Sequence, residues 1–264
     1  MEESDLFFNP SLIDFIQKPG LSIFHLYNGR CTTKSVPQHL EESSSSLHVL
    51  KLENCCVDSH SLEMVLKSCP KLEILSIHVS ETAGADYDDV HWTIDLDHIG
   101  QALRDHGTNL IDLSLDFSNF KMTRKTTGRI GSLCSISGLR HLKCFRNDLI
   151  VAQGWLVDET QEQSILPLES VLPPSITILR IFYEKHRNPS SPPGNVVSTE
   201  INNILSSGRL GSLRRIQSQR YHCSPDELIL FQTQRPGWSF DSKRTLCEGQ
   251  NGFIEYMSIN KLGL

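Results

Sequence analysis

Apolar residues recur along this chain at fixed spacings over most of its length. The pattern is apolar-x-x-apolar-x-apolar followed by a small polar residue, and its clearest copies begin at Leu47 and Leu139. The seven approximate copies begin at Leu21, Leu47, Leu72, Leu110, Leu139, Ile176 and Leu213. Successive copies start 26, 25, 38, 29, 37 and 37 residues apart. An internal repeat of this kind predicts a chain built from stacked copies of one structural unit.

The spacing of the copies matches the leucine-rich repeat, whose period is about 20 to 29 residues. The apolar-x-apolar core of each copy predicts a short parallel strand with its apolar side chains inward, and the polar residue after it predicts a turn. The three long intervals exceed the period by roughly ten residues, so we expect inserted loops there. One unit cannot bury its own apolar face, and at least about three must stack to be stable.

Apolar residues at helical spacing appear between several predicted strands. They predict helices over residues 59–67, 97–106 and 199–207. Ser59 is the expected cap of the first helix, which stops at the Cys69-Pro70 pair. A glycine follows the second and the third helix, where it is a common stop signal. Strands and helices therefore alternate.

This alternation predicts an α/β fold in the form of an irregular leucine-rich-repeat solenoid. We expect a curved parallel sheet on the concave side, with helices and irregular returns on the convex side. Residues 1–20 are predicted to form an N-terminal capping segment, residues 21–222 about seven degenerate repeats, and residues 223–264 a C-terminal cap. Caps are expected because the end units of a stacked array expose apolar edges.

Composition and charge narrow the class of protein. Of the 264 residues 38% are hydrophobic, yet no apolar run approaches the roughly 18 residues that a membrane span needs. The net charge of −6 gives no basic footprint for nucleic acid. The eight cysteines are scattered, and the apparent glycosylation sites at Asn9 and Asn188 are spoiled by the proline after each. We therefore expect a cytoplasmic or nuclear protein that contacts neither membrane nor nucleic acid.

The sequence offers no motif for catalysis. It lacks Gly-x-Ser-x-Gly, His-Glu-x-x-His and a glycine-rich phosphate loop. Sulfur and imidazole are locally dense at Cys55, Cys56, His60, Cys69 and His78, but the Cys-x-x-Cys spacing of a zinc knuckle does not occur. Cys55 also occupies the turn position of its repeat. The prediction is a protein that is not an enzyme and has no metal and no cofactor.

A protein partner is the expected ligand, and the concave face is its expected site. Side chains alternate along a strand, so the residues that flank the third apolar position of each copy point away from the core. The candidate partner-binding residues are Tyr27, Lys51, Glu53, His78, Asp116, Lys143, Phe145, Arg180 and Phe182.

Two interpretations of Phe145 and Phe182 remain open at this point. In the first, the rings form an exposed apolar spot beside Lys143 and Arg180, and burying each ring on a partner contributes about 2 kcal/mol. In the second, the inserted stretch 152–174 folds over the rings and makes them part of the core.

The repeat pattern resembles that of a known family. The motif from Leu47 to Val57, the return SLEMVLKSCPKLEIL and the later LESVLPPSITILRI resemble the repeat portion of F-box/leucine-rich-repeat proteins, particularly the divergent fungal type. The resemblance covers roughly residues 20–220. It implies substrate recognition for a cullin-type ubiquitin ligase. The alternative is a free-standing scaffold or enzyme regulator that binds a protein through the same face, unrelated to ubiquitin.

In that family an F-box precedes the repeats and docks the ligase adaptor. Here residues 1–20 precede the first repeat, and they are too few for a three-helix F-box. We therefore expect contact with a ligase adaptor only if an F-box exists outside this chain.

Overall fold

The repeated motif forms a row of parallel strands. The computed structural model describes residues 16, 18–32, 45–79, 94–117, 126–152, 165–183, 193–222, 237–246 and 253–263. Each of the seven motifs forms a strand. The strands are β1 (Ile23–Tyr27), β3 (Val49–Val57), β4 (Ile74–Val79), β6 (Asp112–Asp116), β8 (His141–Phe145), β9 (Ile178–Tyr183) and β10 (Arg215–His222). Each begins two residues after the first apolar residue of its motif, so the predicted strand positions are confirmed.

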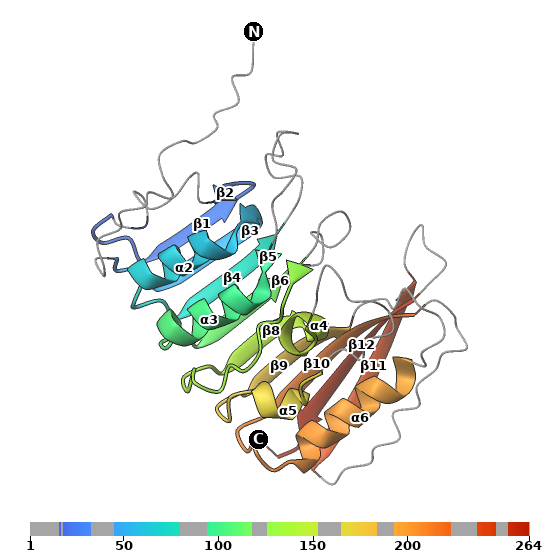
Figure 1. Ribbon diagram of the computed structural model, residues 1–264. Coiled ribbons are helices and arrows are strands. Elements are labelled where there is room, and N and C mark those ends of the chain that lie inside the picture. Colours follow the sequence, from blue (N-terminus) through green and yellow to red (C-terminus); the bar gives the residue numbers. More distant parts are fainter. Residues whose placement is uncertain are drawn as a thin grey trace.

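These strands pair in chain order within one sheet, and every pairing from β1 to β10 is parallel (Figure 1). The short β2 (Arg30–Cys31) pairs with the far end of β3. A separate two-stranded sheet joins β5 (Ile94–Asp95) to β7 (Thr126–Thr127). The mostly parallel sheet and its helices make the fold α/β, as predicted.

Strand register aligns the leucines of successive motifs into a continuous ladder. The second apolar position of five neighbouring strands forms one fully buried row, made of Leu50, Leu75, Leu113, Leu142 and Leu179. The third apolar position forms a second row two residues further on, where Leu52, Ile77 and Leu115 are also buried. The core of the molecule is therefore built from equivalent residues of neighbouring repeats.

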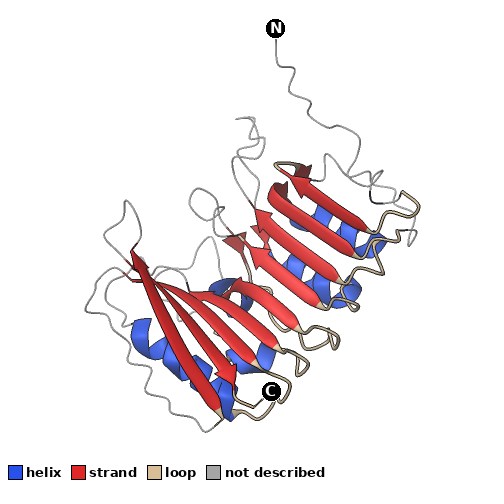
Figure 2. Cartoon of the chain, turned by 180° about the vertical axis from the view of Figure 1, so that it is seen from behind, coloured by secondary structure: helices blue, strands red, loops and turns tan. Residues whose placement is uncertain are grey.

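Helices cover one face of the sheet and leave the other face open (Figures 1 and 2). They are α2 (Ser59–Ser68), α3 (Leu96–His106), α4 (Arg146–Ile150), α5 (Leu168–Val171) and α6 (Pro193–Ser206). Leu62, Val65 and Leu66 of α2 and Ile99 and Leu103 of α3 are buried, as the helical spacing predicts. None of the helices in the described ranges has the length and apolarity that a bilayer crossing requires.

Two helix starts differ from the sequence prediction. Asp58 caps α2 in place of Ser59, because its carboxylate accepts a 2.7 Å hydrogen bond from the Ser61 N–H. Helix α6 begins at Pro193, six residues before the predicted start at Thr199. Proline fits the first turn of a helix because its missing N–H would have no partner there. The apolar pattern also missed Val197, which precedes the predicted start and is buried.

The end of the chain reverses strand direction. β12 (Phe253–Lys261) pairs antiparallel with β10, and β11 (Trp238–Leu246) pairs antiparallel with β12. This gives the sheet order β1-β3-β4-β6-β8-β9-β10-β12-β11. The predicted caps lie only partly among the described residues. At the N-terminal end Ile16 is buried, and its carbonyl accepts a 2.7 Å hydrogen bond from the Ser45 hydroxyl.

A largely buried ion pair between Arg146 and Glu200 joins α4 to α6 in the C-terminal half. The Arg146 guanidinium donates through Nε to both oxygens of Glu200, at 2.7 and 2.9 Å. The Tyr183 hydroxyl donates to the same carboxylate at 3.2 Å. Burial and the Glu200 charge raise the pKa of Tyr183 well above its ordinary value, so the phenol stays protonated. Because each group has a partner here, the cluster fixes α4 against α6.

Replacing Leu113 with Ala should lower the free energy of unfolding by about 2–5 kcal/mol, because the buried side chain would leave a cavity in the ladder. Replacing the adjacent Ser114, which points to the other face, should change it by less than about 0.5 kcal/mol. Urea unfolding followed by circular dichroism measures both. Equal losses for Leu113→Ala and Ser114→Ala would contradict this assignment of faces.

Candidate binding face

The face of the sheet opposite the helices is here called the open face (Figure 2). Alternation along the strands places rows of polar and aromatic residues on this face. Register places one row across seven parallel strands, formed by His25, Lys51, Ser76, Ser114, Lys143, Arg180 and Gln217. Two of the sequence candidates, Lys143 and Arg180, are direct neighbours in this row. Lys51 lies in the same row near the other end of the sheet.

The remaining candidates occupy a second row, which is divided into two parts. Tyr27, Glu53, His78 and Asp116 are aligned on the first four strands. Phe145 and Phe182 are aligned with each other on β8 and β9. The pairing of β6 with β8 ends at Ser114 and Lys143, so Asp116 and Phe145 are not register partners. The candidates therefore form two groups on the same face of the sheet.

The three aromatic candidates differ in exposure. Tyr27 is 63% exposed, whereas Phe145 is only 7% exposed and Phe182 is half-buried. The two phenylalanine rings lie 5.4 Å apart between centroids, at an angle of 54°. Of the two interpretations left open, the burial of Phe145 contradicts an exposed ring, although Phe145 does not belong to the main cluster of buried core residues. Of the stretch 152–174, which was expected to cover it, residues 153–164 lie outside the described ranges.

A pocket of about 380 Å³ lies on the open face of the C-terminal strands. Phe182 and Tyr256 are its aromatic lining residues, and Lys143, Arg180, Lys243 and Asp241 are its charged ones. Register explains how they meet, because Phe182 pairs with Gln219, Gln219 with Tyr256, and Tyr256 with Lys243. Three sequence candidates thus share a pocket with residues that the sequence analysis did not select.

Asp241, Lys243 and Tyr256 were missed because they belong to the segment assigned to a cap. The signal that could have found two of them is alternation along β11. Trp238 and Phe240 pack against the core, so Asp241 and Lys243, which are exposed, have the opposite orientation. What the sequence could not show is that β12 inserts between β10 and β11 and brings Tyr256 beside the parallel strands.

Positive charge prevails in the pocket. Three cationic side chains face a single carboxylate, and among the described residues no carboxylate lies within 4.0 Å of Lys143, Arg180 or Lys243. The Arg180 Nε donates to the Gln217 side-chain oxygen at 2.7 Å, and the Lys143 Nζ lies 5.4 Å from the centroid of the Phe182 ring. Both contacts orient the cations without neutralising them.

Elsewhere on the open face, carboxylates pair with histidines. The His25 Nε2 lies 3.2 Å from a Glu53 oxygen, and the His141 Nδ1 lies 3.1 Å from an Asp112 oxygen. These pairs leave the carboxylates of the N-terminal half with a local partner. The C-terminal pocket is therefore the cationic part of the face.

Buried thiols have structural positions. The Cys55 Sγ donates to the backbone carbonyls of Leu26 and Glu53, at 3.4 and 3.3 Å. The predicted turn at Cys55 is wrong, because Cys55 lies inside β3 and pairs with Val79 after an irregularity in the register at Glu53. Burial raises the pKa of Cys55 to about 11, and it raises the pKa values of Cys31 and Cys144 further. Because nucleophilic attack and metal binding need the thiolate, these three positions suit neither.

The comparisons with known proteins agree with the repeat pattern. Residues 9–87 match the model of the family described as FBD-associated F-box protein At5g56370, LRR repeats. The match covers less than half of the chain and includes β1, β3 and β4. It supports a leucine-rich-repeat chain of the F-box-associated type. Because that family is named for a plant protein, it does not support the fungal type that the sequence suggested. No curated protein matches the chain.

The raised pKa of Cys55 predicts a loss of stability at high pH. The free thiol value is 9.0 and the folded value about 11, so the folded state holds the proton more tightly. The Cys55 thiol therefore contributes its full stabilisation of the folded state below the free thiol pKa. This stabilisation is lost as pH rises toward the folded pKa, because the unfolded chain releases the proton first. We expect the free energy of unfolding of the wild type to fall more steeply in this window than that of Cys55→Ala. Parallel pH dependences in urea unfolding would contradict this expectation.

Proposed function

We propose that the chain is a non-catalytic, protein-binding leucine-rich-repeat solenoid that holds its partner on the open face, which is the concave face of such an array. The observation that carries this proposal is the cationic, aromatic pocket on that face. A parallel sheet normally has helices on both faces, whereas the helices of this sheet lie on one face (Figure 2). The other face carries the charged and aromatic residues that line the pocket. An exposed surface of this composition is typical of interaction sites.

The chemistry of the pocket defines the kind of partner. The pocket contains three cationic side chains, those of Lys143, Arg180 and Lys243, which have no carboxylate partner among the described residues. Carboxylates of a bound protein would form ion pairs with them. Phe182 and Tyr256 supply ring surface, and burying such a ring on a partner contributes about 2 kcal/mol. We therefore propose an acidic segment with an adjacent apolar or aromatic side chain as the bound element.

The biological role that follows is substrate recognition for a cullin-type ubiquitin ligase. Its support is the match of residues 9–87 to repeats of an F-box-associated family. Contact with a ligase adaptor then depends on an F-box outside this chain. The second candidate is a scaffold or enzyme regulator that uses the same face without a ligase. The free cysteines at the described positions fit a reducing compartment, so the proposed location is cytoplasm or nucleus.

A protein that binds through the pocket should be lost when the charge of a pocket residue is reversed, whereas nonspecific proteins should still be recovered. We expect Arg180→Glu to abolish recovery of the partner when the tagged chain is purified from its native cells. Lys51→Glu is the matched control, because Lys51 lies in the same row of the open face but outside the pocket. Quantitative protein identification compares the two variants with the wild type. Loss with Lys51→Glu and retention with Arg180→Glu would place binding elsewhere on the face.

The same purification distinguishes the two roles. The ubiquitin role predicts a cullin or a ligase adaptor in the recovered complex, because the substrate-binding chain would be joined to the ligase. Arg180→Glu should lose the substrate and keep the ligase components, since these would bind away from the pocket. Recovery of a partner with neither cullin nor adaptor would reject the ligase role and favour the scaffold or regulator.

A further inference from the structure

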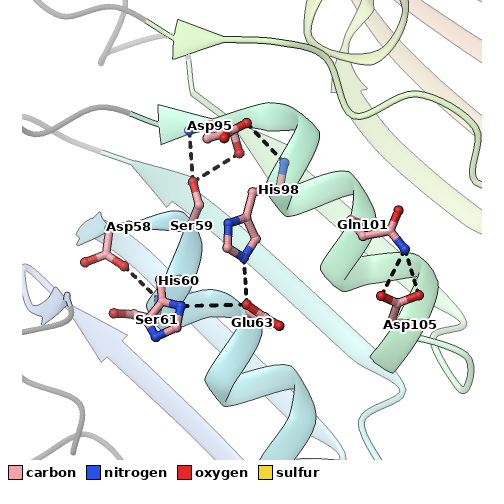
Figure 3. A network of polar contacts seen from close by, with 9 residues as sticks. All are labelled: Asp58, Ser59, His60, Ser61, Glu63, Asp95, His98, Gln101 and Asp105. Atoms are coloured by element: carbon pink, nitrogen blue, oxygen red, sulfur yellow. Dashed lines mark hydrogen bonds and ion pairs between the residues drawn. The ribbon is translucent and has the colours of Figure 1, made fainter. Parts of the chain in front are cut away.

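The N-terminal halves of α2 and α3 bring two imidazoles and a carboxylate together on the helical side of the sheet (Figure 3). The Glu63 Oε2 lies 2.6 Å from the His98 Nε2 and 3.7 Å from the His60 Nδ1. The two imidazole rings have centroids 6.2 Å apart and are nearly perpendicular. One ligand atom from each of the three side chains lies within 4.8 Å of the others.

The backbone around this cluster is fixed by hydrogen bonds. Asp58 caps α2, and the Asp95 carboxylate caps α3 by accepting from the His98 N–H at 3.1 Å. The Ser59 hydroxyl donates to the Asp95 carbonyl at 3.0 Å and accepts from the Asp95 N–H at 2.9 Å. These reciprocal bonds tie the start of one helix to the start of the next (Figure 3). The three side chains therefore project from turns whose relative position is set.

We propose that His60, Glu63 and His98 bind a divalent zinc ion, with water completing its coordination. Two histidines and one glutamate form a ligand set that zinc accepts, at about 2.0 to 2.2 Å from each ligand atom. A tetrahedral ion at those distances needs ligand atoms about 3.4 Å apart. The observed separations of 2.6 and 3.7 Å lie on either side of that value. Between a third and three-fifths of each side chain is exposed, so small rotations reach the required geometry.

An ion pair needs only one imidazole and one carboxylate, whereas this cluster contains two imidazoles beside one carboxylate. His25, His48 and His141 each lie beside one carboxylate, and none of these three pairs gains a third ligand among the described residues. Here a second imidazole from the preceding turn of α2 faces the same carboxylate oxygen. Imidazole nitrogen favours zinc over calcium and magnesium, which prefer oxygen ligands. The bound ion would cross-link two neighbouring repeats on the face opposite the pocket, independently of partner binding.

Zinc titration of the full chain by calorimetry tests the site, with Co²⁺ as a spectroscopic probe and Mg²⁺ as a negative probe. We expect one Zn²⁺ per chain, a rise in the thermal midpoint of unfolding, and a Co²⁺ spectrum without the thiolate charge-transfer band. His98→Gln and His60→Gln should each weaken Zn²⁺ binding by about tenfold or more, since each removes a direct ligand. The matched control, His141→Gln, should bind Zn²⁺ like the wild type.

Three results would overturn the proposal. A thiolate band would show that cysteines bind the metal, and equal binding by all four proteins would place the ion elsewhere. Failure of the folded wild type to bind Zn²⁺ would leave Glu63 and His98 as an ion pair only. Because the substituted side chains are partly exposed, the glutamine variants are expected to fold, and circular dichroism checks this before each titration.

Discussion

Each strand of this sheet can bury its leucines only when the next strand lies beside it in the same register. Leu113 pairs with Leu75 on one side and with Leu142 on the other, and all three are buried. Side chains alternate along a strand, so a slip of one residue would expose the entire row to solvent and bury polar residues. The repeated apolar spacing supplies the same register at every step. Stacking, rather than any single repeat, therefore determines the fold.

The same alternation separates the residues that stabilise the sheet from those that set the chemistry of the open face. Residues that flank the buried positions form rows across the open face, and their identity can vary without altering the leucine ladder. In the N-terminal half this freedom produces paired groups such as His25 and Glu53. In the C-terminal half it produces Lys143 and Arg180 in adjacent positions, beside the ring of Phe182. The chemistry of the face consequently changes along the array while the parallel pairing from β1 to β10 continues.

The strands and the orientation of their side chains could be predicted from the sequence, because both follow from the apolar spacing of each repeat. Features that depend on packing between distant segments could not be predicted from the sequence. The burial of Phe145 depends on its surroundings in the fold, whereas its sequence position resembles that of the exposed Tyr27. Glu63 and His98 are 35 residues apart, and only the packing of α2 against α3 brings them together. Local patterns predict elements and their faces, and contacts between elements require the fold.

The reversal of strand direction at the C-terminal end links array termination to the pocket. An eighth parallel strand would present another copy of the repeat edge, which could pair with a further chain. Instead β12 pairs antiparallel with β10 and β11 pairs antiparallel with β12, and the edge strand β11 exposes the charged Asp241 and Lys243. Charges on an edge strand oppose pairing with other chains. Because these same residues line the pocket with Tyr256, the segment that ends the stacking also supplies the part of the open face that no repeat encodes.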